Sequence, residues 1–237
     1  MRVQAPRLPA RKTPGAGHRG AWLLLLLGAT IAITGLVLEI HLLPRALQSG
    51  EAPLAQTAAP GSMEPGRLGA VLERVAPRLD EGLRGKLADA VLLEATRNGY
   101  DPLFLLALVG VESRWRLSAE SERGARGLLQ LKPSTFAWIS AREPDVGGES
   151  LETGDDPVVD VRLAIRYFSW LERKFHSRDA ALMAYNAGPR RTRQHLRSGD
   201  VPDTLRAYPQ RVRREYERLL GLERLGRDLS GALARAP

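Results

Sequence analysis

Three short segments carry the side chains that could do chemistry in this chain. In the first, Glu112 ends a strongly apolar run, LFLLALVGVES. Burial disfavours the charged form of a carboxylate, so a glutamate in an apolar cleft keeps its proton to higher pH and can act as a general acid. The same spacing fits an exposed helix end at which Glu112 pairs with Arg114 or Arg116. This segment alone leaves both interpretations open.

The second segment contains Gly124 and Gly127 and ends at Gln130. Glycine permits positive φ and a close approach of the backbone to a ligand. The glutamine amide both donates and accepts hydrogen bonds, which suits sugar or peptide amides. No P-loop lysine and serine follow, so the glycines are weak evidence for a phosphate site. An ordinary turn is the alternative.

The third segment, AYNAGP, joins the hydroxyl of Tyr185 to the amide of Asn186 where a helix should end. A core tyrosine followed by a capping asparagine explains the pair equally well. Tyr208, in DTLRAYPQRV, has the same two interpretations.

The elements that must position these residues are all expected to be helices, because the pattern from about residue 67 shows no strand alternation. Gly99 should stop a helix over residues 83–98, and Asp101-Pro102 should begin the next one with an N-cap and a proline in the first turn. That helix is apolar on nearly all faces, so it should lie at the centre of the core. Further helices are expected near Lys132-Pro133-Ser134, from Asp156-Pro157 to about Phe175, over 178–186, and in the basic stretch after Pro189, where one opens near Tyr208-Pro209.

The N-terminus resembles a membrane anchor. Residues 1–20 carry five basic residues and no acids, and residues 21–38 carry no charge over eighteen positions. At about 1.5 Å per residue this run nearly spans a bilayer core. No small-x-small cleavage site follows, which favours an uncleaved anchor over a cleaved signal peptide. The basic flank should stay in the cytoplasm.

Composition excludes several classes of site. The chain of 237 residues has no cysteine, so disulfides, thiolate metal sites and a cysteine nucleophile are excluded. Its four histidines never fall at a ligand spacing, and we expect no metal. The net charge of +8 gathers at the two ends, with twelve arginines against six acids from residue 188 onward. Such ends could meet nucleic acid, anionic lipid or an acidic polymer, or form a solvated helix face.

Taken together, Glu112-Ser113, GARGLLQLKPST over 124–135 and AYNAGP over 184–189 occur in an order and at intervals that resemble the soluble (Slt-type) lytic transglycosylases. The resemblance covers roughly residues 83–220. It implies an all-α, lysozyme-like fold that cleaves the β-1,4 bond between N-acetylmuramic acid and N-acetylglucosamine in peptidoglycan, without metal or cofactor. The expected layout is a basic cytoplasmic tail (1–20), a transmembrane anchor (21–43), a linker (44–69), the transglycosylase domain (70–225) and a tail (226–237).

The resemblance also assigns the site. Glu112 matches the single catalytic acid, and the matching substrate-binding positions are Ser113, Ser121, Leu129, Gln130, Tyr185, Asn186 and Tyr208. Leu129 replaces a usual methionine, Asp160 stands where asparagine is common, and Asp203 stands where the late motif usually has glutamate.

The implied product is a 1,6-anhydromuramoyl end, formed without water. Two rival functions are a muramidase on the same fold, with Glu120 or Glu122 positioning water, and a non-catalytic peptidoglycan-binding scaffold. A nucleic-acid role has no recognisable reader motif behind it. The expected location is the bacterial inner membrane, with a single pass and the catalytic domain in the periplasm. The expected partners are peptidoglycan strands, the inner membrane, and cell-wall or secretion machinery.

Overall fold

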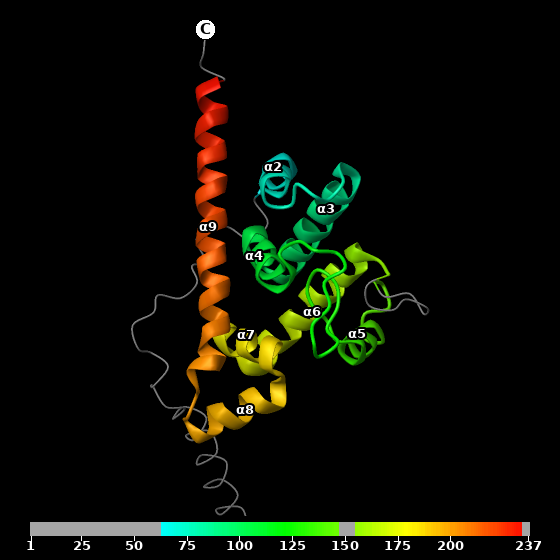
Figure 1. The fold of residues 1–237 in the computed structure, drawn as a ribbon, viewed down its shortest axis with the longest axis vertical. Helices are drawn as coiled ribbons and strands as arrows, with labels where there is room; N and C mark the ends of the chain where they lie inside the picture. Colours follow the sequence, from blue (N-terminus) through cyan, green and yellow to red (C-terminus); the bar gives the residue numbers. More distant parts are fainter. Residues whose placement is uncertain (1–62, 147–154, 234–237) are drawn as a thin grey trace, which may run out of the picture. The chain divides into compact units, whose positions relative to one another are not determined.

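The computed structural model describes residues 63–146 and 155–233, which all belong to one compact unit, Leu54–Pro237. Within these ranges the chain forms helices and two isolated bridges in the loop before α5, which confirms the expected all-α class (Figure 1). The helices are α2 (Pro65–Val75), α3 (Glu81–Asn98), α4 (Pro102–Ser113), α5 (Pro133–Ser140), α6 (Pro157–Phe175), α7 (Arg178–Ala187), α8 (Pro189–Ser198) and α9 (Asp203–Leu233).

Local sequence signals set most helix ends. The Asp101 side chain accepts a hydrogen bond from the Leu103 amide at 2.8 Å, and Pro102 follows it in the first turn of α4. Asp156 caps α6 in the same way. Gly99 ends α3 at φ 72°, a conformation that suits a residue without Cβ. These ends were all predicted from the sequence.

Helix α4 is the centre of the domain, as its apolar sequence predicts. Every residue from Pro102 to Val109 is buried. The helix packs against α3 and α9, between which it lies in Figure 1. Phe104 contributes an aromatic contact to α6, with its ring centroid 5.6 Å from that of Phe168. The apolar part of α4 thus anchors the helix and brings its last turn, with Glu112, to the edge of the core.

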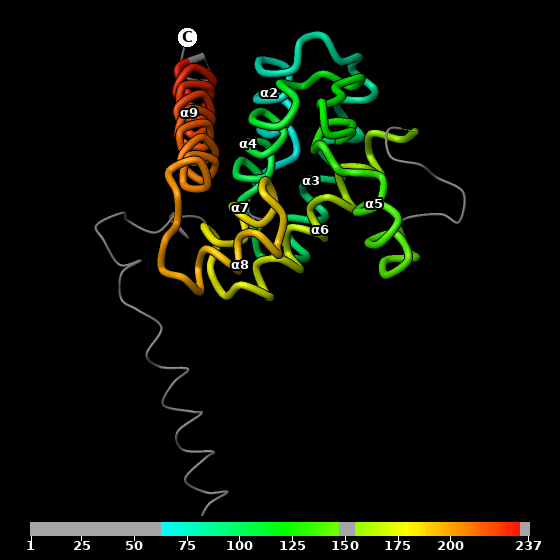
Figure 2. The backbone as a smooth tube through the Cα atoms, turned by 60° about the horizontal axis from the view of Figure 1, so that its bottom comes forward, coloured from blue at the N-terminus to red at the C-terminus, as the bar shows by residue number. Residues whose placement is uncertain are grey.

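Helices α6, α7 and α9 lie on the other side of the core edge at which Glu112 is placed. Helix α7 packs against α6, α8 and α9, and Figure 2 shows α7 and α8 beside the start of α9. A buried ion pair fixes α6 against α3: the Nε atom of Arg166 lies 3.1 Å from an oxygen of the fully buried Glu94. Removing one partner would leave an uncompensated buried charge, so the pair holds the two helices in register.

Two helices start earlier in the chain than their sequence signals indicated. Helix α2 begins at Pro65 inside the expected linker, because Leu68 is buried in the core. Helix α9 begins at Asp203 rather than near Tyr208-Pro209, and continues through Pro209. Burial of Leu205, Tyr208 and Val212 compensates for the backbone hydrogen bond that Pro209 cannot make.

The expected tail from residue 226 is helical as far as Leu233. Glu223, which is 7% exposed, forms an ion pair with Arg67 of α2 that ties this end of α9 to the domain, and a second one with Arg227 within α9.

The expected anchor at residues 21–43 lies outside the described residues. In the part of the chain that the structure describes, no helix is long and apolar enough to cross a membrane.

Candidate active site

The last turn of α4 presents Glu112 at the protein surface. The helix ends at Arg114, whose φ of 52° turns the chain away, and the Arg114 amide bonds the Gly110 carbonyl at 3.2 Å. Ser113 stabilises this end, since its Oγ donates to the Val109 carbonyl at 3.2 Å and accepts from the Trp115 amide at 3.1 Å. Glu112 is therefore held on a fixed backbone and is partly buried.

Helix α9 supplies the partner of this carboxyl. The hydroxyl of Tyr208 donates a short hydrogen bond to Glu112 Oε1. The Tyr208 ring is 1% exposed, so it is fixed in the core. Burial and the neighbouring charge of Glu112 keep the pKa of Tyr208 well above its ordinary value, and the phenol therefore stays a donor.

Opposing effects set the pKa of Glu112. Burial raises it, while the hydrogen bond from Tyr208 and the positive charge of Arg211 lower it, and the result is a pKa of about 7 against an ordinary 4.5. A carboxyl with this pKa is partly protonated at neutral pH, so it can both give and take a proton. The partial burial of Glu112 and its hydrogen bond from Tyr208 rule out the interpretation as an exposed partner of Arg114 or Arg116.

The loop between α4 and α5 forms one wall of the site. Gln130, at φ 49°, folds its side chain back so that Nε2 donates to the carbonyls of Ala119 and Gly127, both at 2.9 Å. Ser121 closes a turn in the same loop, with its Oγ accepting from the Ala125 amide at 3.0 Å. The loop is thus held by its own hydrogen bonds, and the amide oxygen of Gln130 stays available.

Gly127 is explained by packing. It lies at φ 75° directly over the buried side chain of Asp160 on α6, whose Oδ2 atom would overlap a Cβ at this position. Gly124 has a similar φ of 71° but open space around it, so it serves the turn alone. The two glycines therefore shape the loop.

Helix α7 forms the opposite wall. The hydroxyl of Tyr185 donates to the Leu129 carbonyl at 2.7 Å, which ties α7 to the loop. The next residue, Asn186, is exposed, and Gly188 ends the helix at φ 90°. Tyr185 therefore fixes the width of the space between the walls.

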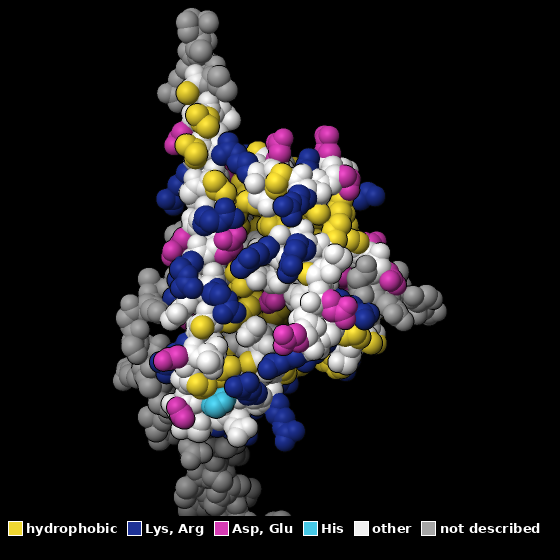
Figure 3. Space-filling model, viewed as in Figure 1, with side chains coloured by type: hydrophobic (Ala, Val, Ile, Leu, Met, Phe, Trp, Pro, Cys, Tyr) yellow, Lys and Arg dark blue, Asp and Glu magenta, His cyan; other side chains and the backbone are white. Residues whose placement is uncertain are grey.

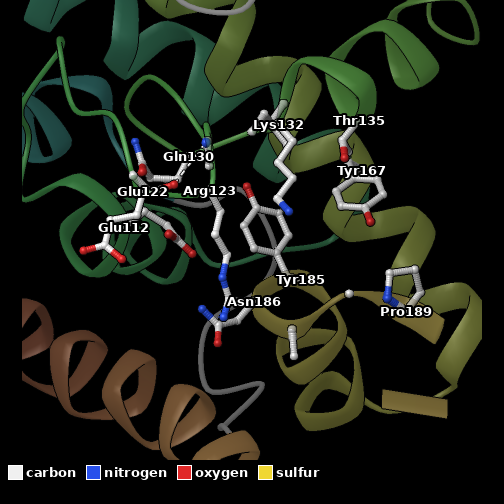
Figure 4. Close-up of a pocket in the computed structure, with 15 residues that line it drawn as sticks. Glu112, Glu122, Arg123, Gln130, Lys132, Thr135, Tyr167, Tyr185, Asn186 and Pro189 are labelled. Carbon is white, nitrogen blue, oxygen red and sulfur yellow. Dashed lines mark hydrogen bonds between the residues drawn. The ribbon is translucent and has the colours of Figure 1, made fainter. Parts of the chain in front are cut away.

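Between these walls lies a cavity of about 480 Å³, which we call the cleft. Such a volume suits a small ligand or part of a polymer. Figure 4 shows its lining residues: Glu112, Ser121, Glu122, Arg123, Ala125, Gln130, Leu131, Lys132, Thr135, Tyr167, Tyr185, Asn186, Ala187, Gly188 and Pro189.

Five of the predicted site residues meet in the cleft: Glu112, Ser121, Gln130, Tyr185 and Asn186. Three do not line it. Ser113 and Leu129 are only 1% and 2% exposed, because the helix end and the core take their side chains. Tyr208 reaches the site only through Glu112. In this structure these three side chains lie behind the lining of the cleft, and their contact with substrate stays a prediction.

The sequence did not single out several lining residues. Arg123, Lys132 and Thr135 lie beside the motif positions, and Tyr167 comes from α6. No spacing rule marked them, since only the folding of the loop over α6 turns them toward the cleft. Tyr167 lines the cleft although most of its side chain is buried, at 9% exposure, beside Phe168.

The two other acids proposed from sequence have different places. Glu120 does not line the cleft, and its carboxylate lies 3.3 Å from Arg126 in an exposed ion pair. Glu122 lines the cleft but is exposed. In the described part of the chain, no group of three or more His, Asp or Glu side chains could hold a metal ion.

Comparison with known proteins agrees with this geometry. Residues 89–204 match the model of the family described as the transglycosylase SLT domain. This stretch is therefore similar to a transglycosylase SLT domain. The match includes Glu112, the loop and α7, and ends before Tyr208. Tyr208, whose hydroxyl bonds the Glu112 carboxyl, thus lies just outside the matched residues.

Solved structures of lytic transglycosylases are similar to the chain. An inactive mutant of the lytic transglycosylase Slt from Pseudomonas aeruginosa is 28% identical, with a TM-score of 0.48, over 61% of this chain and 24% of that one. The 70 kDa soluble lytic transglycosylase from Escherichia coli is 19% identical, with a TM-score of 0.48, over 66% and 29%. A complex of the 70 kDa soluble lytic transglycosylase with bulgecin A is 21% identical, with a TM-score of 0.44, over 68% and 28%. The chain thus spans less than a third of the length of these proteins.

Proposed function

We propose that this protein is a peptidoglycan lytic transglycosylase. It cleaves the β-1,4 bond between N-acetylmuramic acid and N-acetylglucosamine and leaves a 1,6-anhydromuramoyl end. The observation that carries the proposal is Glu112, a partly buried carboxyl with a pKa of about 7 that lines the cleft of an SLT domain.

The first half of the reaction uses Glu112 as an acid. Its proton passes to the glycosidic oxygen as the bond from muramoyl C1 to that oxygen breaks, and the N-acetylglucosamine side leaves as an alcohol. The carbonyl oxygen of the substrate's own N-acetyl group bonds to C1 and takes up the developing positive charge. Such substrate assistance replaces the second carboxylate that most glycosidases need.

The second half uses the same residue as a base. The ionised Glu112 takes the proton of the muramoyl C6 hydroxyl, and the C6 oxygen bonds to C1 as the N-acetyl oxygen departs. The 1,6-anhydro ring is then closed and Glu112 is again protonated, without water. Tyr208 assists because its hydrogen bond stabilises the carboxylate between the two steps.

The cleft walls would position the strand for both steps. The free amide oxygen of Gln130 can accept from a sugar hydroxyl or an N-acetyl N–H, and the exposed amide of Asn186 can donate and accept. Tyr185 holds the two walls together through its bond to the Leu129 carbonyl.

One alternative has an observation in its favour. Glu122 lines the cleft and could position a water, which would make the enzyme a muramidase. Its exposure argues against a tightly held base opposite Glu112. A non-catalytic scaffold would have no use for an acid with the pKa of Glu112.

Mass spectrometry of the products separates these functions. The full-length chain in mild detergent, acting on purified peptidoglycan, should release muropeptides lighter by one water than the reducing-end products of a muramidase. Reducing-end products would establish the muramidase. Binding without any release, identical to that of Glu112→Gln, would establish the scaffold.

The location and partners belong to the same proposal. Residues 21–43 would anchor the protein in the inner membrane as a single pass, with the SLT domain in the periplasm facing the wall. Cell-wall or secretion machinery would direct its action. Accessibility of the domain to protease in intact and permeabilised spheroplasts tests this placement: digestion only after the inner membrane is opened would refute it.

A further inference from the structure

Two cations in the cleft have no acidic partner within the part of the chain that the structure describes. Arg123 and Lys132 both line it and both are exposed. Among the described residues, neither has a carboxylate within ion-pair distance, whereas the neighbouring Arg126 is paired with Glu120. Unpaired cations on the wall of a substrate cleft point to an anionic part of the ligand.

The loop holds these cations where a substrate would pass. The amide of Gly124 bonds the Ser121 carbonyl at 2.8 Å, and this turn carries Glu122 and Arg123 at its tip. Lys132 is the residue before α5, fixed by the start of that helix. In Figure 4 both basic side chains extend from the loop side of the cleft toward Tyr185 and Asn186 on α7.

The charge balance of the cleft is positive. Arg123 and Lys132 contribute two positive charges, Glu122 one negative charge, and Glu112 only part of one because its pKa is about 7. Arg211 adds a further positive field at Glu112. Basic side chains also lie along α9 and over neighbouring elements in Figure 3.

The sugars of a peptide-bearing glycan strand are neutral, because the carboxyl of the muramoyl lactyl group forms an amide with the stem peptide and carries no charge. The ionised carboxylates of such a strand lie on its stem peptides. Uncharged donors suffice for neutral sugar hydroxyls, so two unpaired positive charges are better matched to a carboxylate. The two positive charges are therefore best explained by an interaction with the stem peptide next to the scissile bond.

We infer that Arg123 and Lys132 bind the carboxylates of the stem peptide on the muramoyl residue, and so make the enzyme selective for strands whose stem carboxylates are free. This inference rests on the proposed transglycosylase function. Because the contact is remote from the breaking bond, it stabilises bound substrate and transition state alike, and its effect appears in KM more than in kcat.

The test compares two forms of one substrate. Peptide-bearing glycan oligomers are used either with free stem carboxylates or after those carboxylates have been amidated. A third substrate carries no peptide, so its lactyl carboxylate is exposed. The full-length wild type is compared with a double variant, Arg123→Gln with Lys132→Gln. The control double variant, Lys86→Gln with Arg224→Gln, removes the same two charges from exposed positions outside the cleft.

Since an exposed ion pair changes affinity by a factor of about two to five, the wild type should prefer free over amidated stems roughly fivefold or more, through a lower KM. The cleft variant should lose this preference and the control should keep it. Three results would each overturn the inference: a cleft variant that keeps the wild-type preference for free stems, a control variant that loses it, or a wild type that prefers peptide-free strands. Equal release of anhydromuropeptides from both stem forms by the wild type would also overturn it, leaving the proposed function intact, while absence of anhydro products would count against that function itself.

Discussion

Replacing Glu112 by glutamine should stabilise the protein at alkaline pH, at the same time as it abolishes cleavage. The fold raises the pKa of this carboxyl from 4.5 to about 7, so the folded state prefers the protonated form. As pH rises from 4.5 toward 7, the unfolded chain loses this proton first, and the folded state must increasingly carry an unfavourable charge. The stability contributed by the protonated carboxyl is thus lost as pH rises through this window.

The size of the effect follows from the two pKa values. One pKa unit corresponds to about 1.4 kcal/mol, so ionised Glu112 lowers the free energy of unfolding by about 3 kcal/mol at pH 8 but by less than about 1 kcal/mol at pH 5. Glutamine has nearly the same shape and can still accept from Tyr208, without a charge to bury. The gain from Glu112→Gln should therefore be about 2–3 kcal/mol larger at pH 8 than at pH 5.

Guanidinium unfolding of the full-length chain, followed by tryptophan fluorescence at both pH values, measures this difference. The matched control is Glu122→Gln, an exposed carboxylate of the same cleft, which should change the unfolding free energy by less than about 0.5 kcal/mol at either pH. If Glu112→Gln gave the same stability change at pH 5 and pH 8, Glu112 would not be a buried acid, and the mechanism would lose its basis.

Two other substitutions test the geometry around this carboxyl and loop. Tyr208→Phe removes the hydrogen bond that lowers the pKa of Glu112, so the limb of the pH–activity profile that reports Glu112 should move upward by about 1 pH unit, and a downward or absent shift would contradict that role. Gly127→Ala combines a positive φ with overlap on Asp160 and should lower the unfolding free energy by about 2–3 kcal/mol. Gly124→Ala has a similar φ but open space and should lower it by about 1 kcal/mol. Equal costs in the two variants would show that Asp160 does not limit the loop.

The helices were predictable because their signals are local. Asp101-Pro102, Gly99 and Asp156 each act on a backbone within a few residues, and an apolar run such as that of α4 has few places to lie except the core. Pro209 shows the limit of this reasoning. A proline usually marks a helix start, but packing of residues on both sides carried α9 through it.

The site was predictable in part for a different reason. Its motif residues lie close in sequence to Glu112 or to the end of α7, and their order resembles that of a known family. Their individual roles were less certain, since a motif gives a position but not a direction. Ser113 and Leu129 belong to the motifs and yet turn into the protein, where one supports the helix end and the other fills the core.

By itself, the sequence determined the all-α class and the central apolar helix, because each depends on residues that are neighbours along the chain, and the order of three motifs marked Glu112 as the candidate acid. Only the tertiary structure decided the chemistry of that acid. The pKa of Glu112 depends on burial and on Tyr208, ninety-six residues later, and the charge of the cleft depends on Arg123 and Lys132 facing α7. Burial, hydrogen bonds and fields act through space, so they exist only once distant segments have been brought together.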